Sequence, residues 1–222
     1  TNAVVNFYSG NIAGNRAATY GGGVGISAGR FNLYGGSIVG NTQYWTDGRG
    51  GGGVAVLGGT FNMYGGSVSD NVAATSAGGG VYLNQGSSSS ANSIFNLSGG
   101  TIAANSGSGV YSINHTKNEI NISGGSITGN TQLGGICLNS GNLTLSGGEI
   151  TGNASTISSS AGGIYYYEGQ SFKVSGNPVV KDNTLKGKTS NIYISKSHLN
   201  EPLMITIDGP MTEGASLGVS KK

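Results

Sequence analysis

The sequence predicts an all-β fold, a single-stranded right-handed parallel β-helix (a β-solenoid) of about seven coils with three short strands each. Three observations predict it: the chain repeats every 26 to 30 residues, each repeat holds short apolar runs of period two, and glycines separate the runs. Glycine makes up 44 of the 222 residues, too many for ordinary helices. Because so short a repeat cannot bury its own apolar face, neighbouring repeats must stack.

The first strand of each repeat follows a small residue and a glycine. Coiling in parallel register would place its inward residues on top of one another, and parallel crossovers strongly prefer the right-handed sense. The inward apolar residue recurs at Val24, Val54, Val81, Val110, Ile136, Ile164 and Ile192.

The second strand has the pattern apolar-x-apolar-x-Gly-Gly, where the glycine pair permits a sharp turn. It begins at Phe31, Phe61, Phe95, Ile120, Leu143 and Phe172, and degenerates at Ile205.

The third strand has the pattern apolar-x-x-Asn, and we expect the Asn side chains to hydrogen-bond from coil to coil. In the last full repeat Val179 puts Asp182 in that place and Asn183 one residue later, which predicts a slip or an insertion. The regular asparagines are Asn41, Asn71, Asn105, Asn130 and Asn153.

One domain is expected over residues 1–222. It comprises a partial first coil (1–15), six regular coils (16–192), and a degenerate last coil with a C-terminal cap (193–222). Since residue 1 falls in mid-coil, we expect either a segment of a longer protein or an end capped by its own N-terminal residues.

Composition argues against several classes of partner. The formal net charge is +2, from 11 basic and 9 acidic residues, and this near balance does not indicate a basic surface for nucleic acid. No apolar run is long enough to span a bilayer, so we expect no membrane insertion by this segment. Cys137 is the only cysteine, which excludes an internal disulfide. No cofactor is expected.

Repeats such as GGICLNSGNLTLSGGEITGN, and the ending NIYISKSHLNEPLMITIDGPMTEGASLGVS, resemble the pectin-lyase-like right-handed parallel β-helix repeats of large, adhesin-like bacterial surface proteins. The resemblance covers nearly the whole chain and rests on turn and core residues. It implies export, an extracellular or cell-envelope location within a longer surface protein, and contact with glycans or with proteins of host or neighbouring cells.

Candidate binding residues come from the outward positions of the first strand, which read Gly25, Ala55, Tyr82, Tyr111, Cys137, Tyr165 and Tyr193. Tyrosines stacked one coil apart would form a flat platform for sugar rings or a protein partner, or would only stabilise the solenoid surface. The candidates are Tyr82, Tyr111, Tyr165 and Tyr193. Tyr8, Tyr34 and Tyr64 form a second outward column, with the same two interpretations.

The longest insert, residues 42–50, carries the only Trp and an acidic and basic pair. Loops on a rigid scaffold often carry recognition, although the Trp would equally fold back as a lid. The candidates in this loop are Tyr44, Trp45, Asp47 and Arg49.

Enzymes of this fold that cleave acidic polysaccharide need clustered carboxylates, and the aligned coils place none together. Cys137 and His115 fall about 13 Å apart along the strands, too far for a nucleophile and base. Neither catalytic residues nor metal ligands are therefore predicted. The favoured hypothesis is a non-catalytic, adhesin-like module. The alternatives are a polysaccharide lyase or glycoside hydrolase, a structural spacer, and an ice- or water-ordering face of Ser and Thr.

Overall fold

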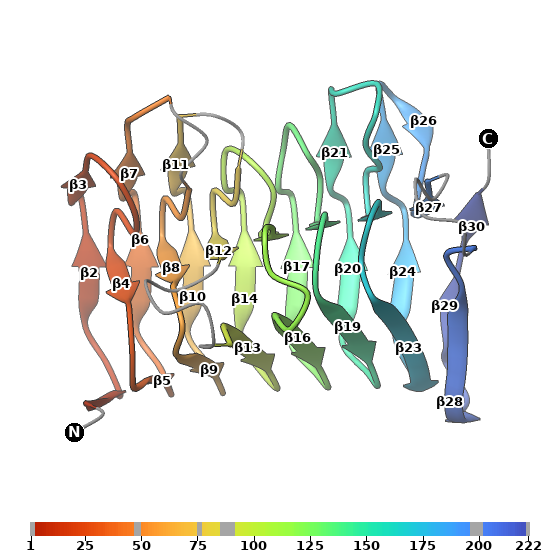
Figure 1. The fold of residues 1–222 in the computed structure, drawn as a ribbon, viewed down its shortest axis with the longest axis horizontal. Coiled ribbons are helices and arrows are strands. Elements are labelled where there is room, and N and C mark those ends of the chain that lie inside the picture. Colours follow the sequence, from red (N-terminus) through yellow and green to blue (C-terminus); the bar gives the residue numbers. More distant parts are fainter. Residues whose placement is uncertain (1–2, 47–49, 75–76, 85–91, 196–201, 221–222) are drawn as a thin grey trace.

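The computed structural model describes residues 3–46, 50–74, 77–84, 92–195 and 202–220. Within these ranges the chain forms strands, turns and loops without any helix, and its parallel sheets stack as a β-solenoid (Figure 1). The solenoid makes about six turns, slightly fewer than the seven coils predicted. None of the described segments is a helix long and apolar enough to cross a membrane.

Three parallel eight-stranded sheets form the walls of the solenoid. Sheet D holds the first strand of each repeat: β4 (Val24–Ile26), β8 (Val54–Val56), β12 (Val81–Leu83), β15 (Val110–Ser112), β18 (Ile136–Leu138), β22 (Ile164–Tyr166), β27 (Ile192–Ile194) and β30 (Val219–Ser220). Sheet A holds the second: β1 (Val4–Phe7), β5 (Arg30–Leu33), β9 (Thr60–Met63), β13 (Ile94–Leu97), β16 (Glu119–Ile122), β19 (Asn142–Leu145), β23 (Ser171–Gly176) and β28 (Ile205–Met211). Sheet B holds the third: β2 (Asn11–Ala13), β6 (Ser37–Val39), β10 (Ser67–Ser69), β14 (Thr101–Ala103), β17 (Ser126–Thr128), β20 (Glu149–Thr151), β24 (Val179–Lys181) and β29 (Ser216–Leu217).

Short fourth strands, which the sequence did not predict, follow sheet B in several coils. They form a parallel sheet C of β3 (Arg16–Ala17), β7 (Thr42–Gln43) and β11 (Val72–Ala73), and a sheet E of β21 (Ala154–Ser155), β25 (Thr184–Leu185) and β26 (Lys188–Thr189). The predicted insert at residues 42–50 therefore begins with a strand, β7, rather than with a loop.

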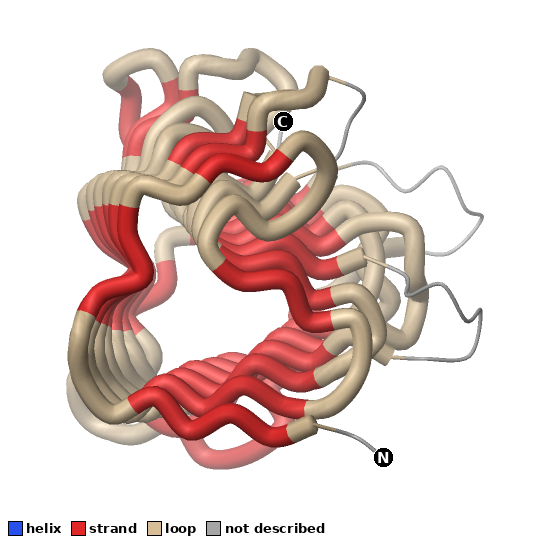
Figure 2. Tube along the Cα trace, turned by 90° about the vertical axis from the view of Figure 1, so that its left-hand side faces the viewer, coloured by secondary structure: helices blue, strands red, loops and turns tan. Residues whose placement is uncertain are grey.

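The core lies inside the stacked coils, which overlie one another when viewed end-on (Figure 2). The predicted inward residues pair in register across sheet D, as Val54 with Val81 and Val81 with Val110 show. All three are fully buried. Sheet A contributes the aromatic residues Phe61 and Phe95, whose rings stack with centroids 5.4 Å apart. The repeat thus lays like side chains over one another, as predicted.

The predicted asparagine column forms a continuous hydrogen-bonded ladder beside the core. In each step up to Asn183 the backbone N and the side-chain Nδ2 of one Asn donate to Oδ1 of the Asn in the next coil, at 2.9 to 3.1 Å. Asn183 ends the ladder by donating in the same way, at 3.0 and 3.2 Å, to Asn191 in the connection directly before β27. Each step satisfies polar groups that would otherwise be buried without partners. The ladder runs through Asn15, Asn41, Asn71, Asn105, Asn130, Asn153, Asn183 and Asn191.

The slip or insertion predicted near Val179 is confirmed as an insertion. Leu145 pairs with Val174 and Ile150 with Val180, so this repeat has one more residue between its second and third strands than the preceding coil. Ile150 pairs with Val180, not Val179, so Asn183 stands three residues after the inward residue as in every other coil. Asn183 accordingly accepts hydrogen bonds from Asn153. Val179 is apolar and therefore resembles the first residue of the apolar-x-x-Asn pattern, but the residue that occupies this position is Val180.

The second glycine of each Gly-Gly pair adopts a backbone that other residues resist. Gly66 has φ +74° and Gly100 has φ +85°. At Gly100 a Cβ would also lie 2.7 Å from the Gly66 carbonyl oxygen of the preceding coil. These turns therefore need glycine for both dihedral and spatial reasons.

Candidate functional site

The predicted tyrosine column of sheet D is in register. Tyr82 pairs with Ala55 and Tyr111, and Cys137 lies between Tyr111 and Tyr165. Tyr193 follows Tyr165. The column therefore stands outside the main core, as the alternation of inward and outward residues requires.

The prediction that this column forms a surface platform is wrong, because the column is covered. Tyr82 is 1% exposed, Tyr111 8% and Tyr165 7%, and they belong to a second apolar cluster. Tyr193 is only partly buried.

The cover comes from the connections that lead back to sheet D. Ala77 and Ala161, both in such connections, pack in this second cluster. A Cβ built on Gly50 would lie 2.6 Å from Cδ2 of Tyr82, so this connection touches the ring directly. Close approach of small residues thus turns an outward face into a second core.

The rings in this column lie face to face. Tyr82 and Tyr111 have centroids 5.9 Å apart and an interplanar angle of 3°, and Tyr165 and Tyr193 have 5.7 Å and 4°. Both geometries fall in the range of favourable aromatic pairs. The column thus consists of two short parallel stacks, with Cys137 on the coil between them.

Cys137 is a buried free thiol, and burial raises its pKa. Its S–H donates to Oδ1 of Asn139 at 3.5 Å, and Nδ2 of the same amide donates to the Tyr111 hydroxyl at 2.9 Å. A raised pKa keeps the thiol protonated at neutral pH, whereas a nucleophile has to be a thiolate. His115, in the loop between β15 and β16, is not one of the residues that line the pocket beside Cys137.

In the predicted recognition loop, Tyr44 and Trp45 follow strand β7 and are 44% and 47% exposed. The Arg16 guanidinium lies 5.1 Å from the Tyr44 ring centroid, a cation–π contact between neighbouring coils. Asp47 and Arg49 lie outside the described residues. Gly50, at the end of this insert, approaches Tyr82, but the second apolar cluster contains neither Tyr44 nor Trp45.

An aromatic stack that is exposed lies at the end of the strands of sheet A. Tyr8, Tyr34 and Tyr64 are 65%, 42% and 49% exposed. Their centroids are 4.8 and 4.9 Å apart, with interplanar angles of 10° and 13°. We call these three residues the outer tyrosine stack. Since neighbouring rings cover each other's faces, the stack presents ring edges and hydroxyls along its side.

The outer tyrosine stack ends at Ser98, which takes the same place in the next coil. The backbone N of Ser98 donates to the Met63 carbonyl, just as that of Tyr64 donates to the Leu33 carbonyl. Ser98 is exposed and small, so it does not cover the ring face of Tyr64 that points toward it. Ser123 is exposed one coil further on. One tyrosine face thus borders a row of serines.

Amide side chains run beside this stack and this row, on the outward face of sheet A. Each Nδ2 donates to Oδ1 of the preceding member at 2.7 to 2.9 Å. Asn32 and Asn62 are 7% exposed, while Asn96 and Asn121, beside the serine row, are more open. The column consists of Asn6, Asn32, Asn62, Asn96 and Asn121.

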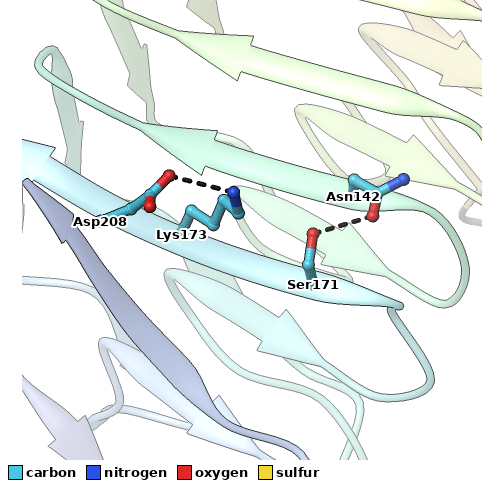
Figure 3. Close-up of polar contacts among 4 residues, drawn as sticks. All are labelled: Asn142, Ser171, Lys173 and Asp208. Carbon is cyan, nitrogen blue, oxygen red and sulfur yellow. Dashed lines mark hydrogen bonds and ion pairs between the residues drawn. The ribbon is translucent and has the colours of Figure 1, made fainter.

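The same face becomes charged and hydroxyl-rich toward the C-terminus. Lys173 Nζ and Asp208 Oδ2 are 3.0 Å apart on β23 and β28, and Ser171 Oγ donates to Asn142 Oδ1 at 2.8 Å (Figure 3). The ion pair is about half exposed on both sides, so it contributes roughly 0 to 1 kcal/mol.

Among the residues that the structure describes, no group of three or more His, Cys, Asp or Glu side chains is placed to hold a metal ion. The chain matches no protein-family model, no curated protein and no solved structure. The strand register alone therefore supports the parallel β-solenoid.

Proposed function

We propose that this chain is a non-catalytic, adhesin-like module of a bacterial surface protein, with a pectin-lyase-like β-helix, that binds glycan on the outward face of sheet A. The outer tyrosine stack carries the proposal. A stack of three tyrosines, 42% to 65% exposed, is an unusual concentration of aromatic surface on a chain with 8% aromatic residues. Exposed aromatic side chains with polar tips suit ligands that are apolar on one face and hydroxylated at the edge.

The geometry favours one arrangement of the ligand. A sugar ring would stack on the open face of Tyr64, because Tyr34 covers the other face of Tyr64 and both faces of Tyr34 are covered by its neighbours. The following sugars would lie along the serine row, where Ser98 and Ser123 supply hydroxyls and Asn96 and Asn121 supply amides. A chain of sugars running along the solenoid axis would meet the same groups every ~4.8 Å.

Two features support a non-catalytic role. The Cys137 thiol, whose pKa burial raises, is held in the protonated form. The carboxylate of Asp208, on the proposed binding face, is engaged by Lys173. Polysaccharide cleavage and a purely structural spacer role remain as alternative outcomes of the test below.

Replacing Tyr64 with Ala should weaken glycan binding about tenfold, the loss of one stacking contact worth roughly 1.4 kcal/mol. Ligands found on a glycan array would be titrated by calorimetry against the wild type and Tyr64→Ala. The matched control is Tyr44→Ala, which removes an equally exposed tyrosine away from this face and should leave the affinity unchanged.

Far-UV circular dichroism would show that both variants stay folded. Equal losses in the two variants would contradict the assignment to the outer tyrosine stack. Binding to no glycan would leave the spacer role, and release of unsaturated or reducing sugars from polysaccharides by the wild type would favour an enzyme.

A further inference from the structure

The column of tyrosines on sheet D is interrupted at Cys137, where a side chain without a ring occupies a place between two aromatic stacks. One face of Tyr111 is covered by Tyr82, so its other face turns toward the Cys137 coil. Tyr165 stacks on Tyr193 and also on Tyr167, whose ring centroid is 5.6 Å away at an interplanar angle of 28°. Tyr111 and Tyr165 stand on coils two steps apart, about 10 Å at the usual strand spacing.

A pocket of about 250 Å³ fills this interruption. It is lined by Tyr111, Tyr165 and Tyr167, by Cys137 and Asn139, and by Leu133 and Ser159. A ring placed midway between these two coils would lie about 5 Å from the open face of Tyr111, within the centroid range of stacked aromatic pairs. The pocket is therefore one ring thick.

The chain itself fills a comparable interruption elsewhere in the column. At Gly25 and Ala55, the outward residues of sheet D are also too small to stack. There Tyr20 enters from the preceding connection and stacks on Tyr82, with centroids 6.0 Å apart and an interplanar angle of 27°. Because Tyr111 already covers one face of Tyr82, Tyr20 takes the other. An aromatic ring inserted from the side is thus an arrangement that this scaffold already accommodates.

The groups around the pocket are uncharged. Burial raises the pKa of Tyr111, of Tyr165 and of the Cys137 thiol, so all three stay neutral at physiological pH. An ionic ligand would lose its hydration without gaining a counter-charge. The Asn139 amide, bonded to the thiol and to the Tyr111 hydroxyl, offers polar atoms for one hydroxyl or N–H on the ligand.

We propose that the pocket between Tyr111 and Tyr165 binds the single neutral aromatic ring of a small ligand, stacked on the open face of Tyr111 and enclosed by Tyr165 and Tyr167 beside Cys137. This site is separate from the outer tyrosine stack and does not depend on glycan binding there. The ligand class is a phenol or a similar one-ring compound with one hydrogen-bonding group.

The experiment titrates 4-fluorophenol into the wild-type protein and follows ¹⁹F chemical shift and line width. We expect a Kd on the order of 1 mM, as for a very small ligand with few atoms. 4-Fluorobenzoate, which is charged, and 4-fluorocyclohexanol, which has no aromatic face, should each bind at least tenfold more weakly.

Replacing Cys137 with Tyr should fill the interruption with the chain's own ring and reduce 4-fluorophenol binding at least tenfold. A retained far-UV spectrum and an unchanged or raised Tm would show that this variant is folded. Should it fail to fold, Tyr165→Leu provides the second test, because it keeps an apolar wall but removes the aromatic ring opposite Tyr111; binding should then fall about fivefold. Ser98→Tyr, which lengthens the outer tyrosine stack, is the matched control and should leave 4-fluorophenol binding unchanged.

Absence of 4-fluorophenol binding by the wild type would overturn the proposal. Equal binding of 4-fluorocyclohexanol, or undiminished binding by a folded Cys137→Tyr variant, would overturn it as well. Loss of glycan binding in Tyr64→Ala bears on the other face alone, so failure of either proposal can be told from failure of the other.

Discussion

Replacing Asn105 with Asp should lower the free energy of unfolding by about 4 kcal/mol, the largest effect we expect from an isosteric change. Asn105 is fully buried in the middle of the asparagine ladder. Its Nδ2 donates to the Val68 carbonyl at 3.0 Å and to Asn130 Oδ1 at 2.9 Å. A carboxylate oxygen in that place would lose both hydrogen bonds and face two acceptors.

Urea unfolding followed by far-UV circular dichroism measures this loss. Asn96→Asp is the matched control, since Asn96 belongs to the partly exposed amide column on sheet A. Its Nδ2 donates to Oδ1 of Asn62 there. Water reaches this column, so we expect a loss of about 1 kcal/mol there. Equal losses at both positions would mean that the buried ladder has no special part in stability.

Replacing Gly80 with Ala should cost about 3 kcal/mol, the second largest effect expected, through overpacking at the entrance to strand β12. A Cβ on Gly80 would lie 2.5 Å from the Gly109 carbonyl oxygen and 2.9 Å from Cγ2 of Ile102. That carbonyl accepts the backbone hydrogen bond of Val81 at 2.8 Å. The new methyl group would therefore push two coils apart and weaken the sheet.

Gly25→Ala serves as the control for Gly80→Ala, because a Cβ there meets nothing within 4 Å and the next coil already has Ala55 in the same place. We expect a change within about 0.5 kcal/mol of the wild type, measured by the same urea unfolding. A destabilisation by Gly25→Ala as large as that by Gly80→Ala would contradict the steric explanation.

Most of the solenoid could be predicted from the sequence, because its repeat fixes both strand order and register. The inward valines of sheet D, the glycine turns and the asparagine ladder all follow from spacing alone. Near Val179 the sequence indicated a slip or an insertion without locating it, and the register places one extra residue between β23 and the true inward residue, Val180.

What the sequence did not show is which outward column would be covered. A period of two tells which side chains leave the core, but not what lies over them. The connections that cover Tyr82 vary in length between repeats, so they do not align. One signal was present nonetheless: strands of sheet D such as VYL and ICL have no outward polar residue, which is typical of burial on both faces.

The second column, Tyr8 with Tyr34 and Tyr64, appeared equivalent to the first at the level of sequence. Its strands differ in one respect, since sheet A alternates apolar residues with asparagines, as expected for a strand with one solvated face. This alternation distinguishes the exposed stack from the buried one. The interruption at Cys137 was visible in the column, but its meaning depends on the burial of the neighbouring rings.

The central claim is that each repeat makes one circuit and advances one strand spacing, and distances between spin labels test it most directly. In a Cys137→Ala background, one cysteine would replace Ala13 and a second would replace Thr128, Thr151 or Lys181, and both would carry nitroxides. These positions belong to one column of sheet B, and the second cysteine lies four, five or six coils from Ala13, respectively. Pulsed electron paramagnetic resonance should give distances that increase by about 5 Å from each pair to the next, near 19, 24 and 29 Å. Distances that do not rise in these steps would contradict the stacked register on which both proposed sites depend.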